Sequence, residues 1–141
     1  GDGLGALTCV DPSVIDEHGQ PKLVWRNTDV ERSVSTMSIV DGLAYAADYA
    51  GKVFCFDAKT GEKKWEHDTL AHIWASTLVA DGKVIIGNED GIVTILAAGP
   101  EKKLLAEVEF PSKVYSSAVL SNGVLYIATP SHLFAIDASA E

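Results

Sequence analysis

Three basic or titratable side chains recur along the sequence at nearly equal intervals. Arg32, His72 and Lys113 are separated by 40 and 41 residues. Cations that converge in a partly desolvated site attract carboxylates and phosphates. If the chain folds as equivalent units, this spacing therefore predicts an anion-binding site. The alternative is that charged residues simply begin surface strands, and the spacing alone leaves both interpretations open.

Aromatic residues follow at the same spacing. Two positions after the three residues above, the sequence has Val34, Trp74 and Tyr115. An indole or phenol ring can stack on a flat ligand, and it can equally pack between repeated units. We therefore expect Trp74 and Tyr115 to lie beside the basic residues, in one of these two roles.

A second group of side chains has the chemistry of metal ligands. Asp48, Glu89 and Asp90 lie in short loops that end in glycine, and His72 and His132 are expected on the same face. Oxygen ligands on such a loop suit calcium, and a histidine with carboxylates suits a transition metal. These residues have no compact ligand spacing, so solvated acids in turns are the competing interpretation.

The sequence contains none of the short motifs that carry catalysis. It has no Gly-x-Ser-x-Gly nucleophile elbow, no glycine-rich phosphate loop and no Cys-x-x-Cys pair. The recurring serine and threonine pairs have no assigned base and are poor nucleophiles. No catalytic residue is therefore assigned.

The elements that would position these residues are indicated by repeated hairpin turns. Asp41-Gly42, Asp81-Gly82 and Asn122-Gly123 recur at intervals of 40 and 41 residues, each between two apolar runs. Asp-Gly and Asn-Gly are the preferred two-residue turns because both central residues need positive φ. A third strand follows each turn, and a fourth follows in the first two repeats, which predicts about four strands per repeat.

Four strands in a repeat of about 40 residues are typical of propeller blades. We therefore expect an all-β fold of four-stranded antiparallel blades, about three and a half in the chain. The alternative is an ordinary β-sandwich with coincidental turns. The expected units are strands three and four of one blade with a polar insertion at Pro12–Pro21 (1–30), two full blades (31–68 and 69–110), and three strands of a last blade (111–141).

Composition narrows the range of possible binding partners. The 141 residues carry a formal net charge of −9, and the basic residues are scattered, which argues against binding nucleic acid. No apolar run has the length of a membrane helix. Cys9 and Cys55 occupy the same repeat position, so we expect two buried thiols rather than a disulfide, and they do not settle the compartment.

The run from Phe56 to Trp65, Phe-Asp-Ala-Lys-Thr-Gly-Glu-Lys-Lys-Trp, resembles the tryptophan docking motif of pyrroloquinoline-quinone-type propeller repeats. Such repeats occur in quinoprotein alcohol dehydrogenases and in the propeller lipoprotein of the bacterial outer-membrane assembly machinery. The resemblance implies a bacterial protein of the periplasm or cell surface, with pyrroloquinoline quinone and calcium as the cofactors of the catalytic members. Those enzymes also need a vicinal Cys-Cys pair, which this sequence lacks.

Three functions remain after these observations. The first is a non-catalytic scaffold in the envelope that binds a protein or a small anionic ligand. The second is a fragment of a quinone-dependent dehydrogenase, and the third is a small hydrolase, with or without a metal, at the channel of a homodimer. Three and a half blades leave two sheet edges open, so we expect either a longer chain or two copies that close a ring of about seven blades.

Overall fold

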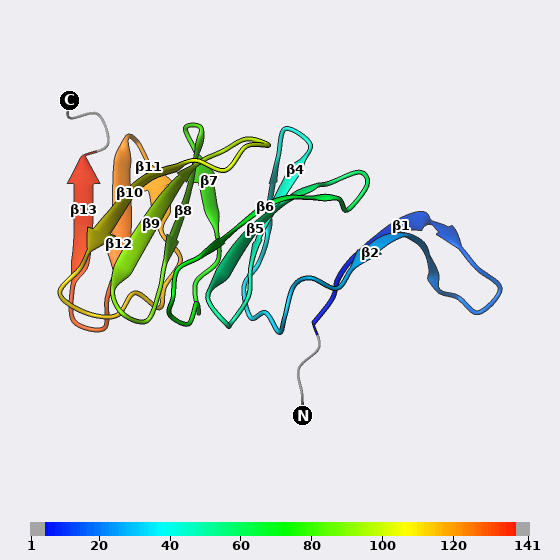
Figure 1. Ribbon diagram of the computed structural model, residues 1–141, viewed down its shortest axis with the longest axis horizontal. Helices are drawn as coiled ribbons and strands as arrows, with labels where there is room; N and C mark the ends of the chain where they lie inside the picture. The colour runs from blue at the N-terminus through cyan, green and yellow to red at the C-terminus, as the bar shows by residue number, and fades with distance from the viewer. Residues whose placement is uncertain (1–4, 138–141) are drawn as a thin grey trace.

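The computed structural model describes residues 5–137 and is built of β-strands alone within that range (Figure 1). Thirteen strands form four antiparallel sheets, as the repeat predicted. A hairpin of β1 (Leu7–Ile15) and β2 (Pro21–Asn27) stands first, and three larger sheets follow side by side. The fold is that of consecutive propeller blades.

Each of the next sheets follows the chain in a simple meander from an inner to an outer strand. The second sheet contains β3 (Ser38–Val40), β4 (Leu43–Ala47), β5 (Lys52–Asp57) and β6 (Lys63–Asp68). The third contains β7 (Leu78–Ala80), β8 (Lys83–Gly87), β9 (Ile92–Ala97) and β10 (Leu104–Glu109). The fourth contains β11 (Val119–Ser121), β12 (Val124–Ala128) and β13 (Leu133–Asp137).

The three predicted hairpin turns occupy matching corners of these sheets. They join β3 to β4, β7 to β8 and β11 to β12. Asp41, Asp81 and Asn122 all have φ of 50°, and the glycine after each also has positive φ. Both central residues are left-handed, as the favoured two-residue hairpin turn requires. The sequence repeat is therefore a repeat in space.

The core lies between neighbouring sheets. The middle strands carry most of it, and Val53 to Phe56 of β5 are fully buried. Tyr45 and Trp65 of the second sheet join Ile73 and residues of the third in one apolar cluster. Because each sheet covers its neighbour, we expect the blades to stabilise one another.

Two tryptophans contact the next sheet at the turn between its third and fourth strands. Trp25 Nε1 donates a hydrogen bond to the Ala58 carbonyl at 3.0 Å, and Trp65 Nε1 donates to the Gly99 carbonyl at 2.9 Å. Gly61 has φ of +74°, and a Cβ there would lie 2.6 Å from the Trp25 ring. The glycine thus closes the turn and leaves room for the indole.

The polar insertion at Pro12–Pro21 belongs to the first hairpin. Strand β1 continues to Ile15, which pairs with Pro21, so the insertion lengthens the hairpin. Asp16 Oδ1 accepts hydrogen bonds from the amides of His18 and Gln20 and closes the tip. The long hairpin projects from the three larger sheets in Figure 1.

The third sheet has no tryptophan at the position that Trp65 occupies in the second sheet. Trp65 lies opposite Cys55, and the equivalent pair in the third sheet is Ala106 opposite Ile95. Leu105, which stands nearest in a simple alignment, falls in a β-bulge. Cys9 and Cys55 are both free thiols, and Cys55 is buried as expected, but Cys9 is only half-buried.

Candidate binding site formed by three consecutive blades

The predicted ligand-binding residues lie in the connectors that lead from one blade to the next inner strand. These connectors comprise residues 28–37, 69–77 and 110–118. Each is held by the loop between the second and third strands of a blade. Tyr49 N donates to the Arg32 carbonyl at 2.8 Å, and Glu89 N donates to the His72 carbonyl at 2.9 Å. This repeated backbone bond fixes the first two connectors at equivalent places, whereas in the third connector Val114 N donates to the Asn88 carbonyl at 3.0 Å.

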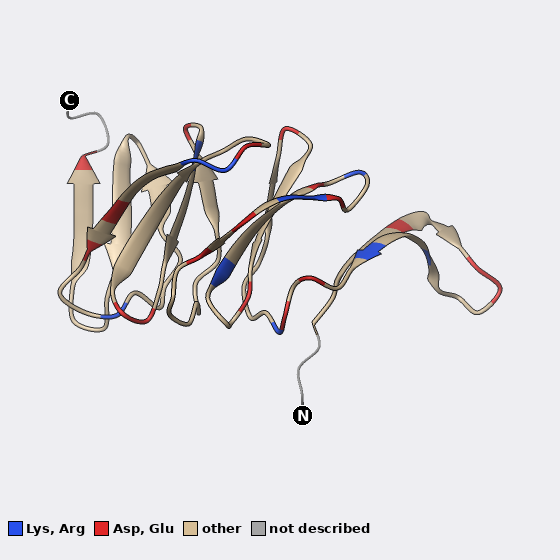
Figure 2. Cartoon of the chain, in the orientation of Figure 1, with Lys and Arg blue, Asp and Glu red and all other residues tan. Residues whose placement is uncertain are grey.

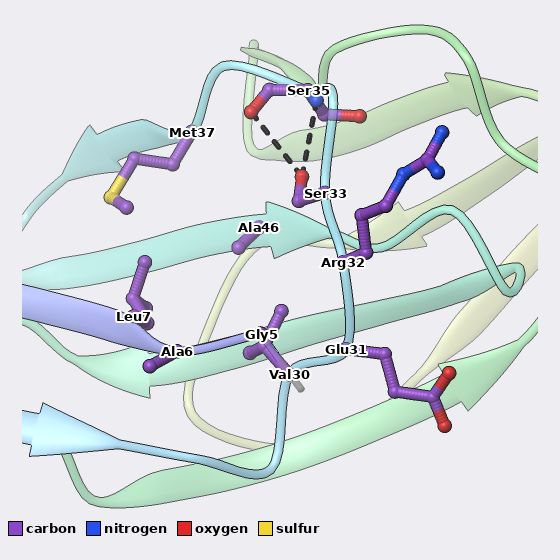
Figure 3. A pocket seen from close by; sticks show the side chains of 10 residues that line it. All are labelled: Gly5, Ala6, Leu7, Val30, Glu31, Arg32, Ser33, Ser35, Met37 and Ala46. Carbon is purple, nitrogen blue, oxygen red and sulfur yellow. Dashed lines mark hydrogen bonds between the residues drawn. The ribbon is translucent and has the colours of Figure 1, made fainter. Parts of the chain in front are cut away.

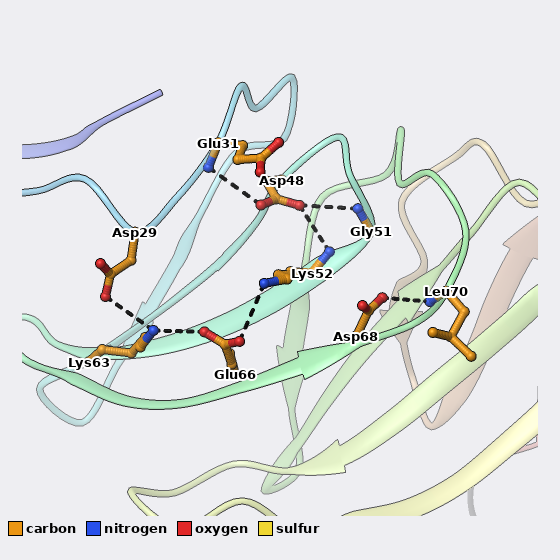
Figure 4. A network of polar contacts seen from close by, with 9 residues as sticks. All are labelled: Asp29, Glu31, Asp48, Gly51, Lys52, Lys63, Glu66, Asp68 and Leu70. Atoms are coloured by element: carbon orange, nitrogen blue, oxygen red, sulfur yellow. Dashed lines mark hydrogen bonds and ion pairs between the residues drawn. The ribbon is translucent and has the colours of Figure 1, made fainter. Parts of the chain in front are cut away.

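Buried polar side chains shape these loops. Asp48 is fully buried, and its Oδ1 accepts from the amides of Gly51 and Lys52 at 3.1 and 2.9 Å (Figure 4). Its Oδ2 accepts from the Glu31 amide at 3.4 Å. Asn88 takes the same role one blade later, with its Oδ1 accepting from the Ile92 amide at 2.9 Å. These contacts satisfy backbone groups that would otherwise be buried without a partner.

The loops and connectors assemble a continuous row of side chains, which we term the mouth strip. Its members come from the second, third and fourth sheets: Arg32, Tyr49, His72, Trp74, Tyr115 and Lys113. All five residues predicted for the ligand site are therefore in one row. Tyr49 is the member that the sequence did not reveal.

Ring contacts join the strip from end to end. The Arg32 guanidinium carbon lies 5.1 Å from the Tyr49 ring centre, and His72 stacks on the same ring at 4.4 Å. Trp74 meets Tyr49 edge to face at 5.0 Å and Tyr115 at 6.0 Å. Lys113 Nζ lies 5.7 Å from the Tyr115 ring. Cation–π and edge-to-face contacts of this kind hold exposed side chains in place.

The two cations at the ends of the strip remain available to a ligand. In the part of the chain that the structure describes, neither Arg32 nor Lys113 belongs to an ion pair. The Tyr115 hydroxyl raises the pKa of Lys113 above its usual value, so the ammonium keeps its charge. Trp74 and Tyr115 are 42% and 40% exposed. The strip thus offers charge and aromatic surface to the solvent.

Other polar groups of the strip already have partners. Trp74 Nε1 donates to Glu89 Oε2 at 3.3 Å, and His72 Nδ1 lies 3.0 Å from the Tyr49 carbonyl oxygen. Glu89 was expected among metal ligands, and in the structure it places a carboxylate beside the middle of the strip. Its role in orienting Trp74 was not foreseen.

The five predicted metal ligands do not form one group. Across residues 5–137, no set of three or more His, Cys, Asp or Glu side chains is placed to hold a metal ion. Asp48 is engaged with backbone amides, Glu89 with Trp74, and His132 Nδ1 lies 2.9 Å from Ser131 Oγ. Asp48 therefore stabilises its own loop and Glu89 orients Trp74, and neither carboxylate is directed to a common centre.

The recurring serine and threonine residues connect the blades. Ser76 Oγ accepts from the Thr36 amide at 2.8 Å, and Ser117 Oγ accepts from the Ser76 amide at 2.8 Å. Thr77 Oγ1 lies 3.3 Å from Ser38 Oγ and 3.2 Å from the Tyr45 carbonyl. We expected these residues to be small because inner strands are crowded. Their hydroxyls also bond across each seam, which leaves them with a structural role.

A cavity of about 360 Å³ adjoins the Arg32 end of the strip. It lies where the first hairpin meets the second sheet and is lined by Leu7, Val30, Met37 and Ala46, among others (Figure 3). The Arg32 side chain is turned away from Leu7 and Met37 in this view. Glu31, Arg32, Ser33 and Ser35 also line the cavity, so it shares Arg32 with the strip.

This architecture defines a class: the chain is a segment of a β-propeller with repeats of the pyrroloquinoline-quinone type. The family model described as outer membrane protein assembly factor BamB matches residues 16–99, and the chain belongs to that family. No curated protein sequence matches the chain.

Several solved structures share the fold. BamB from Moraxella catarrhalis superposes with a TM-score of 0.78 at 19% identity, over 96% of this chain and 41% of that one. Quinohemoprotein alcohol dehydrogenase ADHIIG from Pseudomonas putida HK5 gives a TM-score of 0.64 at 19% identity, over 87% and 26%. A europium-containing methanol dehydrogenase gives 0.56 at 18% identity, over 75% and 22%. The chain thus spans less than half of each relative, and these likenesses concern the fold.

The described residues do not by themselves fit a quinone–calcium site. The strip contains one parallel ring pair, Tyr49 and His72, and these rings already touch each other. The structure also places no group of acidic side chains at the strip that could hold the cation. We therefore derive no chemical step through this cofactor.

Proposed function

We propose that this chain is a non-catalytic propeller segment that serves as a binding scaffold in the bacterial envelope, and that its mouth strip binds an anionic ligand. One observation carries the proposal. Three consecutive blades bring exposed aromatic rings together with two cations, Arg32 and Lys113, that form no ion pair in residues 5–137. The same backbone bond fixes the connectors of Arg32 and His72, so this part of the arrangement is built into the repeat.

The family supports the location. Its description names a factor in outer-membrane protein assembly, and we assign this chain to the same compartment, the periplasm or the cell surface. No helix in the part of the chain described is long and apolar enough to cross a membrane. The contacts of Trp25 and Trp65 with the turns of following blades support the interpretation of these residues as docking tryptophans.

The remaining blades come, in this proposal, from the rest of a longer chain or from a second copy. The first sheet has two strands and the last described sheet has three, so each presents an edge that a neighbouring strand can pair. Light scattering distinguishes the two sources, because only a second copy makes the mass depend on concentration.

Small anions test the ligand proposal. We expect citrate and inorganic phosphate to change the fluorescence of Trp74, the most exposed of the tryptophans at 42%. The double variant Arg32→Gln, Lys113→Gln should weaken this binding at least about fivefold, since each charge-assisted contact contributes to affinity.

The matched control is Lys22→Gln, Lys59→Gln, which removes the same charge from exposed positions outside the strip. Equal loss in both double variants would show that net charge, and not the strip, governs binding, and would overturn the proposal. Added salt should weaken binding in the wild-type chain.

A further inference from the structure

The mouth strip has positive charge only at its two ends. Arg32 lies on Tyr49 at one end, and Lys113 lies on Tyr115 at the other. Between them stand His72 and Trp74, and Glu89 places a carboxylate 3.3 Å from the Trp74 indole nitrogen. A ligand with a single anionic group satisfies one end and leaves the other exposed to water. A ligand with an acidic middle meets the Glu89 carboxylate and is disfavoured.

The length of the strip sets the length of its ligand. Four steps of 5.0 to 6.0 Å lead from the Arg32 guanidinium through Tyr49, Trp74 and Tyr115 to the Lys113 ammonium. The two cations are therefore no more than about 22 Å apart, a span that six or seven extended residues cover.

The ring orientations disfavour a flat ligand. Trp74 lies at 86° to Tyr49 and at 74° to Tyr115, and the parallel pair of Tyr49 and His72 is closed at 4.4 Å. No open parallel pair exists in the strip for a planar molecule to enter. Rings that meet edge to face in this way leave exposed apolar surface, against which apolar side chains can pack.

The composition is that of a protein-binding surface. Tryptophan, tyrosine and arginine are the residues that dominate binding energy at the centres of protein interfaces. Exposed apolar surface continues beside the strip, because Val34 is 50% exposed at the position equivalent to Trp74 and Tyr115. A contiguous exposed apolar surface often marks an interaction site, whereas single exposed apolar residues are ordinary.

We propose that the mouth strip binds an extended acidic peptide segment of a partner protein, with a carboxylate near each end and apolar side chains between them. The inference rests on the proposed function, since it specifies the anionic ligand of the same strip. One carboxylate pairs with Arg32 and the other with Lys113. The apolar residues cover Trp74 and its neighbouring rings, and Glu89 selects against acids at the centre.

A fluorescently labelled peptide, Asp-Ser-Val-Leu-Val-Ser-Asp with blocked ends, tests this by anisotropy. We expect it to bind at least about tenfold more tightly than its isomer Asp-Asp-Ser-Val-Leu-Val-Ser, which has the same composition and both acids at one end. Trp74→Ala should weaken binding by about tenfold or more, as loss of a central aromatic contact does. Arg32→Gln and Lys113→Gln should each remove the preference for the peptide with an aspartate at each end.

A variant of Glu89 gives an independent readout. A peptide with a central aspartate, Asp-Ser-Val-Asp-Val-Ser-Asp, should bind weakly to the wild-type chain and regain affinity with Glu89→Gln. The Lys22→Gln, Lys59→Gln chain serves as the control and should keep the wild-type order of affinities.

Equal affinity for the two isomeric peptides, or no effect of Trp74→Ala, would overturn this inference. If citrate binds at the strip and neither peptide does, the inference fails and the proposed function stands. If no anion or peptide binds in a way that depends on Arg32 and Lys113, both fail.

Discussion

Two buried side-chain atoms within residues 5–137 have no hydrogen-bond partner: Thr94 Oγ1 and His67 Nε2. Buried polar atoms are nearly always hydrogen-bonded, so each of these has an energetic consequence. Thr94 is fully buried in β9, at the position that Phe54 occupies in β5. His67 lies on β6, with Nε2 3.9 Å from Glu107 Oε1 of β10.

We predict that Thr94→Val stabilises the protein by about 1 kcal/mol, because it removes a desolvated hydroxyl and keeps the branched shape. Urea unfolding measures the change. The matched control is Thr77→Val, which deletes a buried hydroxyl that lies 3.2 Å from the Tyr45 carbonyl and should cost about 1 kcal/mol. A loss of stability in both variants would show that Thr94 Oγ1 has a partner in solution.

His67 should make stability depend on pH. Burial lowers the pKa of His67 below its usual 6.5, and Lys102 adds to this effect, while Glu107 and Asp68 oppose it. The unfolded chain therefore binds a proton at higher pH than the folded chain does. The free energy of unfolding should accordingly fall as the pH drops from about 6.5 through the lowered folded pKa.

Thermal unfolding at pH 7 and pH 5 checks this dependence. His67→Gln should flatten the profile in that window, and His18→Gln should not, because the His18 side chain is 77% exposed. Glu66, whose pKa is lowered by Lys63, acts at lower pH. An unchanged slope in His67→Gln would contradict the prediction.

At the same scale, the sequence predicted which residues meet at the strip but not their contacts. Positions 32, 72 and 113, with 74 and 115, were found because equal spacing in a repeat becomes adjacency in space. Tyr49 and Glu89 are also equivalent positions, 40 residues apart, and the alignment of loops contained that signal. Whether Asp48 binds a cation or amides depends on how its loop folds back, which no local pattern specifies.

Elements were predictable where their signals are local. The three two-residue turns and the buried strand from Val53 to Phe56 follow from residue type alone. The insertion at Pro12–Pro21 was not predictable in the same way, because its turn residues at Asp16 and Gly19 compete with Pro12 as the place where the strand ends. Ala106, and not Leu105, lies at the position equivalent to Trp65, because a β-bulge shifts the register of β10 by one residue.

Trp65 provides the test of how sheets hold each other. Its indole is buried between the second and third sheets. The Gly99 amide also donates a hydrogen bond to the Tyr45 hydroxyl at 2.8 Å. Trp65→Ala should destabilise the protein by about 3–5 kcal/mol. Trp65→Phe keeps most of the apolar contact and loses the hydrogen bond, which should cost about 1 kcal/mol.

Urea unfolding of both variants gives these values. Trp25→Phe is the comparison, since its bond to the Ala58 carbonyl holds only the first hairpin and should change the main transition less. If Trp65→Phe lowered the free energy of unfolding as much as Trp65→Ala does, the burial of apolar surface would not explain how Trp65 stabilises the two sheets. The specific shape of the indole would explain it instead.

At the scale of the whole molecule, stability should decrease from the central sheets toward both ends. Charge does not set this gradient, since acidic and basic residues are interspersed over many strands and loops (Figure 2). Burial does. Residues Val53 to Phe56 of β5 are fully buried, whereas in β13 Leu133 is 68% exposed and Ile136 is 41% exposed. Strand β1 pairs with β2 alone, and β13 pairs with β12 alone.

Hydrogen exchange should therefore be slowest in β4, β5, β8 and β9, which have strands on both sides and sheets on both faces. We expect peptides from β1, β2 and β13 to exchange at least about tenfold faster, because edge strands open without disrupting the core. Mass spectrometry at two protein concentrations measures this. Protection of β1 and β13 that rises with concentration would show that a second copy covers both edges. Protection equal to that of β5 at every concentration would contradict the gradient, because a single chain with two open edges cannot hold its outermost strands as firmly as its central ones.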